Sequence, residues 1–166
     1  MKVKAAIYGA SGYTGQELTR ILSGHPQVEL IAVTSRRFAG QRVSDVFPAL
    51  FGLTALTYVD ATPDDIASRC DVVFLALPHG VSMGIAPAFV AAGKKVIDLS
   101  ADYRLRDLAT YETWYAKHQS AELFAKSVYG LPELYREKIK SSSLVANPGC
   151  YPTSIILGLA PALKNG

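Results

Sequence analysis

A glycine-rich turn near the N-terminus places the strongest constraint on how this chain folds. Residues 3–8 form a short apolar run, and the segment Gly9-Ala10-Ser11-Gly12-Tyr13-Thr14-Gly15 follows it directly. Apolar residues then recur at helical spacing over 13–22. A strand, a glycine turn and a helix in this order are typical of the first unit of a Rossmann-type sheet, which binds a dinucleotide.

The individual residues of this turn suit a pyrophosphate. Gly9 permits the tight turn, Ser11 and Gly12 let the backbone approach the ligand, and Gly15 lets the helix pack closely on the strand. Exposed N–H groups and the helix dipole then favour phosphate. The spacing is a variant, because Ser11 stands where a second glycine is usual, and such a turn can also be purely structural. The position of the turn between strand and helix favours binding.

The rest of the chain alternates between two patterns. Short runs rich in Val and Ile, typical of parallel strands buried on both faces, are separated by helix-like stretches. The predicted strands are 3–8, 28–34, 56–58, 72–75, 96–98 and 144–146, with an extended piece at 128–129. The predicted helices are 13–22, 81–92 and 151–163, while 38–53 is expected to be a loop excursion and 103–136 a helical insertion covering one sheet edge. We therefore predict an α/β fold, with a doubly wound, mostly parallel sheet and helices on both faces.

The end of the second strand indicates which cofactor binds. NAD-binding units usually carry Asp or Glu there, about 20 residues after the glycines, to accept from the ribose 2′-hydroxyl. In this chain Glu29 lies at the beginning of the strand, and Ser35, Arg36 and Arg37 follow its end. Two guanidiniums suit a 2′-phosphate, so we predict NADP(H) rather than NAD. The alternative is a solvated basic turn.

Cys150 follows the last predicted strand, within Asn147-Pro148-Gly149-Cys150-Tyr151-Pro152-Thr153. Pro152 suits a first helical turn, which places Cys150 at a helix N-terminus. The helix dipole there stabilises a thiolate by about 0.3–1 kcal/mol, so a strong lowering of the pKa needs a further partner. We predict that Cys150 is a nucleophile, with an ordinary inert thiol as the alternative. Cys70, just before a strand, is expected to be buried and inert.

Three other polar loops follow strands at the same sheet edge: 77–80, 98–104 and 129–133. Arg104 is the best candidate to bind a carboxylate or phosphate. Asp98 and Asp102 are expected to cap turns. Together these loops predict one crevice near the cysteine.

The histidines do not complete a catalytic pair. His79 is expected to position a turn rather than serve as a base, and His25 and His118 fall in segments expected to be exposed. The two cysteines lack the second pair that a zinc site needs, so no metal is predicted.

Composition limits the class of protein. With 49% hydrophobic and 19% charged residues the chain can build a core, and its net charge of +3 comes from scattered residues that disfavour nucleic acid as a partner. No signal peptide or membrane span is predicted, and the sparse cysteines suit a reducing compartment. We expect a soluble cytoplasmic protein.

With these motifs in this order, the chain resembles the N-acetyl-γ-glutamyl-phosphate reductase family, and Pro-Gly-Cys-Tyr-Pro-Thr at 148–153 matches the family's active-site signature. The resemblance implies NADPH-dependent reduction of N-acetyl-γ-glutamyl phosphate to the semialdehyde through a thioester on Cys150, in arginine biosynthesis. Arg104 would contact the substrate. The residues expected to bind NADP(H) are Gly9, Ser11, Gly12, Tyr13, Thr14, Gly15, Ser35, Arg36, Arg37, Leu77, Pro78 and Ser100.

The resemblance also implies a domain plan. Family members are about twice as long and carry a second α+β domain that supplies a catalytic histidine. Residues 1–149 would then be the NADP-binding domain, and 150–166 the cysteine and first helix of a truncated catalytic and dimerisation domain. We expect the chain alone to be inactive and to expose apolar surface, with an acyl phosphate and phosphate as small-molecule partners and a homo-oligomer at full length.

Three alternatives stay open. Aspartate-semialdehyde dehydrogenase shares this plan, although its cysteine context typically differs. A reductase of carrier-bound aminoadipyl phosphate would differ mainly in the second domain. A non-catalytic NADP-sensing module would leave Cys150 as an ordinary thiol.

Overall fold

The sheet of this protein consists of six parallel strands in the order β2-β1-β3-β4-β6-β5. The computed structural model describes residues 1–165. The strands are β1 (Val3–Tyr8), β2 (Val28–Val33), β3 (Val72–Leu75), β4 (Lys95–Asp98), β5 (Val128–Tyr129) and β6 (Leu144–Ala146). The predicted parallel α/β class is confirmed.

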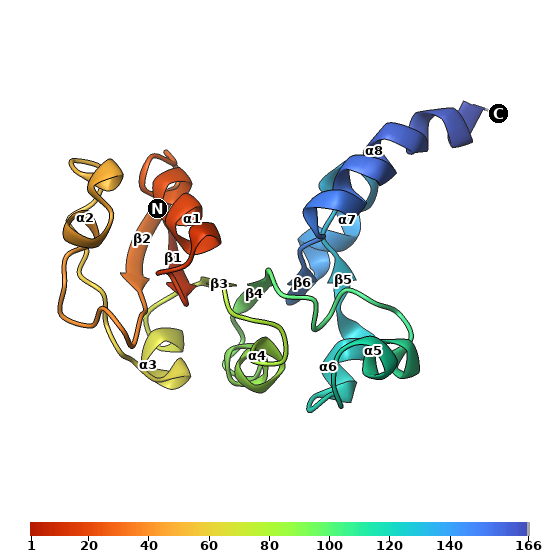
Figure 1. Ribbon diagram of the computed structural model, residues 1–166, viewed down its shortest axis with the longest axis horizontal. Coiled ribbons are helices and arrows are strands. Elements are labelled where there is room, and N and C mark those ends of the chain that lie inside the picture. Colours follow the sequence, from red (N-terminus) through yellow and green to blue (C-terminus); the bar gives the residue numbers. More distant parts are fainter. Residues whose placement is uncertain (166) are drawn as a thin grey trace.

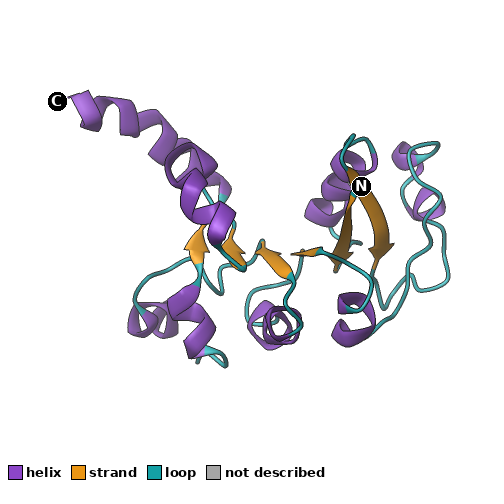
Figure 2. Ribbon diagram, turned by 180° about the vertical axis from the view of Figure 1, so that it is seen from behind, coloured by secondary structure: helices purple, strands orange, loops and turns teal. Residues whose placement is uncertain are grey.

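Helices cover both faces of the sheet, as Figure 1 shows and the reverse view in Figure 2 repeats. One face carries α1 (Tyr13–Ser23), α2 (Val43–Val46), α7 (Pro132–Ser141) and α8 (Cys150–Asn165). The other carries α3 (Pro63–Ala67), α4 (Ser82–Ala91), α5 (Leu108–Trp114) and α6 (Ala121–Lys126). The far end of α8 projects away from the sheet (Figure 1).

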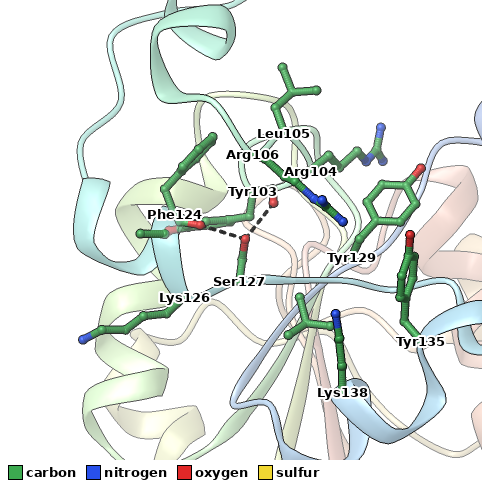
Figure 3. A pocket seen from close by; sticks show the side chains of 12 residues that line it. Tyr103, Arg104, Leu105, Arg106, Phe124, Lys126, Ser127, Tyr129, Tyr135 and Lys138 are labelled. Carbon is green, nitrogen blue, oxygen red and sulfur yellow. Dashed lines mark hydrogen bonds between the residues drawn. The ribbon is translucent and has the colours of Figure 1, made fainter.

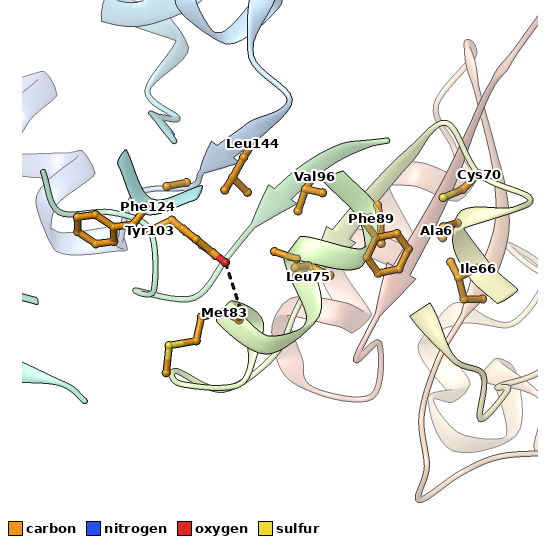
Figure 4. Close-up of a cluster of buried hydrophobic side chains, with 14 of the residues drawn as sticks. Ala6, Ile66, Cys70, Leu75, Met83, Phe89, Val96, Tyr103, Phe124 and Leu144 are labelled. Carbon is orange, nitrogen blue, oxygen red and sulfur yellow. Dashed lines mark hydrogen bonds between the residues drawn. The ribbon is translucent and has the colours of Figure 1, made fainter. Parts of the chain in front are cut away.

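Two buried clusters, one on each side of the sheet, hold these layers together. In β1, Ala5 and Ile7 belong to one cluster and Ala6 to the other, because successive side chains of a strand point to opposite faces. Figure 4 shows the cluster that contains Ala6, where Phe89 of α4 lies near Leu75. Strands buried on both faces explain why their sequences are continuously apolar.

Residues 56–58 do not form the predicted strand. Only isolated bridges occur there, antiparallel between Arg42 and Thr57 and parallel between Thr34 and Val59. The excursion at 38–53 folds into α2 and the short 3-10 helix η1 (Pro48–Leu50), and its Gln41 carbonyl accepts from the Tyr58 N–H at 2.9 Å. The three-residue run therefore joins this excursion instead of the sheet.

The insertion at 103–136 extends the sheet rather than only covering its edge. Its α5 and α6 pack on one face, while β5 pairs with β6 as the outermost strand. His118 in this insertion is only 7% exposed, contrary to expectation, because it packs edge-on against Tyr103, Tyr111 and Phe124.

Candidate nucleotide site and the adjacent cysteine loop

The glycine turn connects β1 to α1 in a conformation that two of its glycines make possible. Gly9 has a φ of 88°, and a Cβ there would lie 2.7 Å from the Ala76 carbonyl oxygen. A Cβ on Gly15 would lie 2.5 Å from the Cα of Ala10. The tight turn and the close helix packing therefore both need glycine.

Gly12 differs from these two glycines, because nothing lies within 4 Å of where its Cβ would be. It is the N-cap residue of α1, and no side chain caps the helix there. The N-terminus of α1 thus has no side-chain cap and open space beside Gly12, which suits an anionic group at the positive end of the helix dipole.

Hydrogen bonds fix the turn to the end of β2. The Ala10 N–H donates to the Thr34 carbonyl at 2.8 Å, and the Gly9 N–H donates to Thr34 Oγ1 at 2.9 Å. The Ser35 hydroxyl donates to the Ser11 hydroxyl at 3.0 Å. Three hydrogen bonds therefore join the glycine turn to the start of the basic segment.

A cavity of about 510 Å³ lies where the chain leaves the neighbouring strands β1 and β3 toward opposite faces of the sheet (Figure 1). This is the usual place for a ligand in a doubly wound sheet. The cavity brings together most of the predicted cofactor residues, namely Gly9, Ser11, Gly12, Ser35, Arg36, Arg37, Leu77 and Pro78. Further residues complete its wall: Tyr8, Thr34, Asp60, Ala61, Ala76, Val81 and Ile85.

Four predicted cofactor residues do not line this cavity. Tyr13 and Thr14 are exposed at the start of α1, and Gly15 is buried beneath the turn. Ser100 is buried, and its hydroxyl donates to Asp98 at 2.7 Å and accepts from the Asp102 N–H at 3.0 Å. Their contacts with a cofactor stay predictions.

Sequence reasoning missed the wall formed by Asp60 and Ala61. The Tyr8 hydroxyl donates to the Ala61 carbonyl at 2.9 Å, and burial raises the pKa of Tyr8. Asp60 is the one acidic residue among the described residues that line the cavity. The sequence did contain a signal for this part of the wall, because the polar residue Asp60 directly follows the short apolar run that ends at Val59.

The chemistry of the cavity wall suits the phosphate groups of a dinucleotide. No side chain caps α1, and the turn before it has no room for a Cβ at Gly9 or Gly15. Arg36 and Arg37 place two cations at the wall of the same cavity. Backbone amides suit a pyrophosphate, and guanidiniums suit a further phosphate.

Cys150 is the first residue of α8, and it is exposed. The turn before it is fixed by Thr153, whose N–H and hydroxyl donate to the Gly149 carbonyl at 3.0 and 2.9 Å. The predicted position at a helix N-terminus is confirmed. Cys70 is buried, and burial raises the pKa of its thiol, as expected for an inert cysteine.

Arg104 joins the cysteine loop to the loop after β4. Its Nε donates to the Asn147 carbonyl at 2.7 Å and its Nη2 to the Leu99 carbonyl at 2.6 Å. Its Nη1 lies 3.3 Å from where a Cβ on Gly149 would be. The guanidinium therefore lies beside the backbone that carries Cys150 and also determines the geometry of that backbone.

Asp98, the last residue of β4, and Asp102, in the loop after it, cap turns as predicted, and Asp102 also caps the start of α4. Asp98 accepts from the Ser100 N–H at 3.1 Å, and burial raises its pKa. Asp102 accepts from the N–H groups of Gly80 and Met83 at 2.8 and 3.0 Å, where α4 begins. These bonds hold the loops after β3 and β4 together.

His79 positions a turn, as predicted, because its Nδ1 accepts from the Ala101 N–H at 2.8 Å. Within residues 1–165, no hydrogen bond joins Cys150 to a histidine and no cluster of three or more potential metal ligands occurs. None of the helices described is both long and apolar enough to span a membrane.

A parallel doubly wound sheet with this glycine turn and cavity defines a nicotinamide-dinucleotide-binding domain. The chain belongs to the family described as semialdehyde dehydrogenase, NAD binding domain, whose model matches residues 4–142. It is 57% identical to the N-acetyl-gamma-glutamyl-phosphate reductases of Desulfotalea psychrophila and Moorella thermoacetica, over 99% of this chain in both cases. The chain covers 47% and 48% of those two proteins, so it spans about half of their length.

Solved structures share the fold. Aspartate semialdehyde dehydrogenase with NADP from Candida albicans superimposes with a TM-score of 0.75 at 22% identity, over 99% of this chain and 48% of that chain. Aspartate semialdehyde dehydrogenase II from Vibrio cholerae gives a TM-score of 0.73 at 20% identity, over 99% of this chain and 47% of that chain.

Proposed function

We propose that this chain forms the cofactor-binding half of an NADPH-dependent N-acetyl-γ-glutamyl-phosphate reductase of arginine biosynthesis. The observation that carries the proposal is Cys150 at the first residue of α8, on a loop that Arg104 fixes at the same sheet edge as the glycine turn. The 57% identity to two reductases of that name favours this substrate over aspartyl phosphate, whose enzymes match at about 20%. The two free cysteines suit a cytoplasmic location.

The cofactor assignment rests on the end of β2. Ser35 is there, with its hydroxyl bonded to Ser11, and residues 34–37 include no Asp or Glu to accept from a ribose 2′-hydroxyl; Asp60 is the one acidic residue among the described residues of the cavity wall. Arg36 and Arg37 line the same cavity and would bind the 2′-phosphate, while the first-turn amides of α1 would bind the pyrophosphate. When bound, NADPH supplies the hydride that reduces the acyl group.

Cys150 would act as the nucleophile. Its thiolate attacks the γ-carbonyl carbon, a carbon–sulfur bond forms, the bond to the phosphate oxygen breaks, and phosphate leaves. The resulting thioester accepts hydride more readily than a carboxylate does. Release of the semialdehyde restores the thiolate. The N-terminus of α8 favours the charged sulfur, and Arg104 beside Gly149 would orient the substrate's anionic group.

The domain plan is also a proposal. Residues 1–149 would be the cofactor domain, and α8 would open a catalytic and dimerisation domain that supplies a histidine. Support comes from a stripe of exposed apolar side chains at four-residue spacing on α8: Tyr151, Ile155, Leu159 and Leu163 are 79%, 58%, 54% and 82% exposed. Such a stripe is typical of a covered interface, so we propose that the chain alone is inactive and that the full-length enzyme is a homo-oligomer.

Alkylation of the full-length enzyme by iodoacetamide at pH 7 tests the nucleophile. Cys150 should react quickly, N-acetyl-γ-glutamyl phosphate should protect it, and buried Cys70 should serve as the internal unreactive control. Two results would show that the substrate assignment is wrong: turnover of aspartyl phosphate instead of N-acetyl-γ-glutamyl phosphate, or alkylation that N-acetyl-γ-glutamyl phosphate does not slow.

Replacement of both arginines tests the cofactor. Arg36→Gln/Arg37→Gln should weaken NADPH binding by about tenfold to a hundredfold and leave NADH binding nearly unchanged, because only NADPH carries the 2′-phosphate. Arg20→Gln is the control, since Arg20 is paired with Glu17 on the surface of α1. An equal effect on both nucleotides would contradict the assignment.

A further inference from the structure

A second cavity, of about 520 Å³, lies at the outer edge of the sheet, beside β5. Three segments line it: 103–106 after β4, 124–129 from the end of α6 through β5, and Tyr135 and Lys138 of α7 (Figure 3). It shares no lining residue with the nucleotide cavity. Arg104 is the one lining residue that also contacts the cysteine loop, and the other lining residues belong neither to the nucleotide cavity nor to that loop.

The charge of this cavity has one sign. Arg104, Arg106, Lys126 and Lys138 line it, and the described residues of its wall include no Asp or Glu. Arg104 donates through Nε and Nη2 to backbone carbonyls, and Lys126 turns away from the tyrosines in Figure 3. Arg106 and Lys138 are therefore the two lining cations left to bind a ligand. No carboxylate in the described wall neutralises their charge.

Two tyrosines give the cavity an aromatic wall with a polar rim. The rings of Tyr129 and Tyr135 are 6.3 Å apart and nearly perpendicular, and their hydroxyls point the same way (Figure 3). Nζ of Lys138 lies 5.7 Å from the centre of the Tyr135 ring, a contact that holds the ammonium at the wall. Leu105, Phe124 and Val128 supply apolar lining.

We propose that this cavity binds a small organic anion with a phosphate or carboxylate head group and a short apolar body. Arg106 and Lys138 would bind the head group together with the tyrosine hydroxyls, and the apolar body would lie against Tyr129, Val128 and Leu105. This inference does not depend on the proposed reductase activity, because Arg106, Lys138, Tyr129 and Tyr135 have no role in the cofactor cavity or at Cys150.

Amide chemical shifts of the ¹⁵N-labelled chain test the proposal. Phenyl phosphate and benzoate are the probes, because they share an apolar ring and differ in head group, and benzyl alcohol is the neutral control. We expect saturable shifts at Ser127, Tyr129 and Tyr135 with at least one anion and none with benzyl alcohol, and the tighter probe identifies the head group. Binding at the glycine turn would be seen separately, at Ser11 and Gly12.

Matched variants separate a site from general attraction to a basic surface. Arg106→Gln/Lys138→Gln should weaken binding at Ser127 and Tyr129 by about tenfold. Arg136→Gln/Lys140→Gln removes the same charge from α7, at residues that do not line the cavity, and should change the affinity less than about twofold. Absent shifts at these amides, equal shifts with benzyl alcohol, or equal weakening by both double variants would overturn the proposal.

Discussion

The guanidinium carbon of Arg37 lies 5.0 Å from the centre of the Phe38 ring. Phe38 is itself held by Tyr58, whose buried ring lies 6.1 Å away. A guanidinium held by an aromatic ring loses less conformational freedom when it binds a phosphate. We therefore expect Phe38 to act as a positioning residue for the nucleotide cavity.

Phe38→Leu should therefore weaken NADPH binding by about two- to fivefold, because leucine keeps the apolar contact with Tyr58 and loses the attraction to the cation. NADH binding should not change. Fluorescence titration with both nucleotides measures this. If Arg37→Gln weakens NADPH binding and Phe38→Leu does not, the positioning role is wrong while the cofactor assignment stands.

Two glycines of the same turn should respond differently to replacement by alanine. Gly15→Ala should lower the free energy of unfolding by about 1–3 kcal/mol, because its Cβ would meet the backbone of Ala10. Gly12→Ala should leave stability nearly unchanged and weaken nucleotide binding, because its Cβ would enter open space at the cavity wall. Urea unfolding and NADPH titration of both variants give the comparison. Equal destabilisation by the two variants would contradict this account of the turn.

Arg104→Lys should disturb the cysteine loop although the charge is kept. Lysine lacks the planar fork that donates to the Asn147 and Leu99 carbonyls, so we expect a stability loss of about 1–3 kcal/mol and slower alkylation of Cys150. Urea unfolding and iodoacetamide kinetics measure the two effects. Lys126→Gln serves as the control, because Lys126 is exposed on α6. Unchanged alkylation in Arg104→Lys would show that the loop does not depend on these bonds.

Two aspartates should give opposite pH dependences of stability. Burial raises the pKa of Asp98, so its protonated form is favoured on folding, and its contribution is fully present below the unfolded-state pKa and is lost as pH rises through the folded pKa. Hydrogen bonds from Thr110 lower the pKa of Asp107, so its contribution is present above the unfolded-state pKa and is lost as pH falls through the folded pKa.

Urea unfolding between pH 3 and 7 checks the signs. The stability of the natural chain relative to Asp98→Asn should fall as pH rises, and relative to Asp107→Asn it should rise. The same direction for both variants would refute the assigned causes of the two pKa shifts.

Local features of the sequence were sufficient for the strands of the central sheet and for the glycine turn. Residues 72–75 match β3 in the structure, and Gly9, Ser11 and Gly12 line the cavity as predicted. These features depend on side-chain periodicity and on backbone conformations that only glycine adopts easily, and both are properties of neighbouring residues.

Contacts between distant segments decided the rest. Val59 pairs with Thr34, which brings Asp60 into the nucleotide wall, although residues 56–58 form no strand. His118 is buried because Tyr103, Tyr111 and Phe124 surround it, and nothing in its own segment indicates this. Its environment depends on how the insertion packs against the sheet.

The sequence by itself determined the parallel α/β class, the glycine turn and the position of Cys150 at a helix start, since each depends on residues close together in the chain. Only the tertiary structure decided that Arg104 fixes the cysteine loop and that β5 borders a cationic cavity. Residues far apart in sequence form these contacts, and their free energy exists only when the whole sheet has assembled.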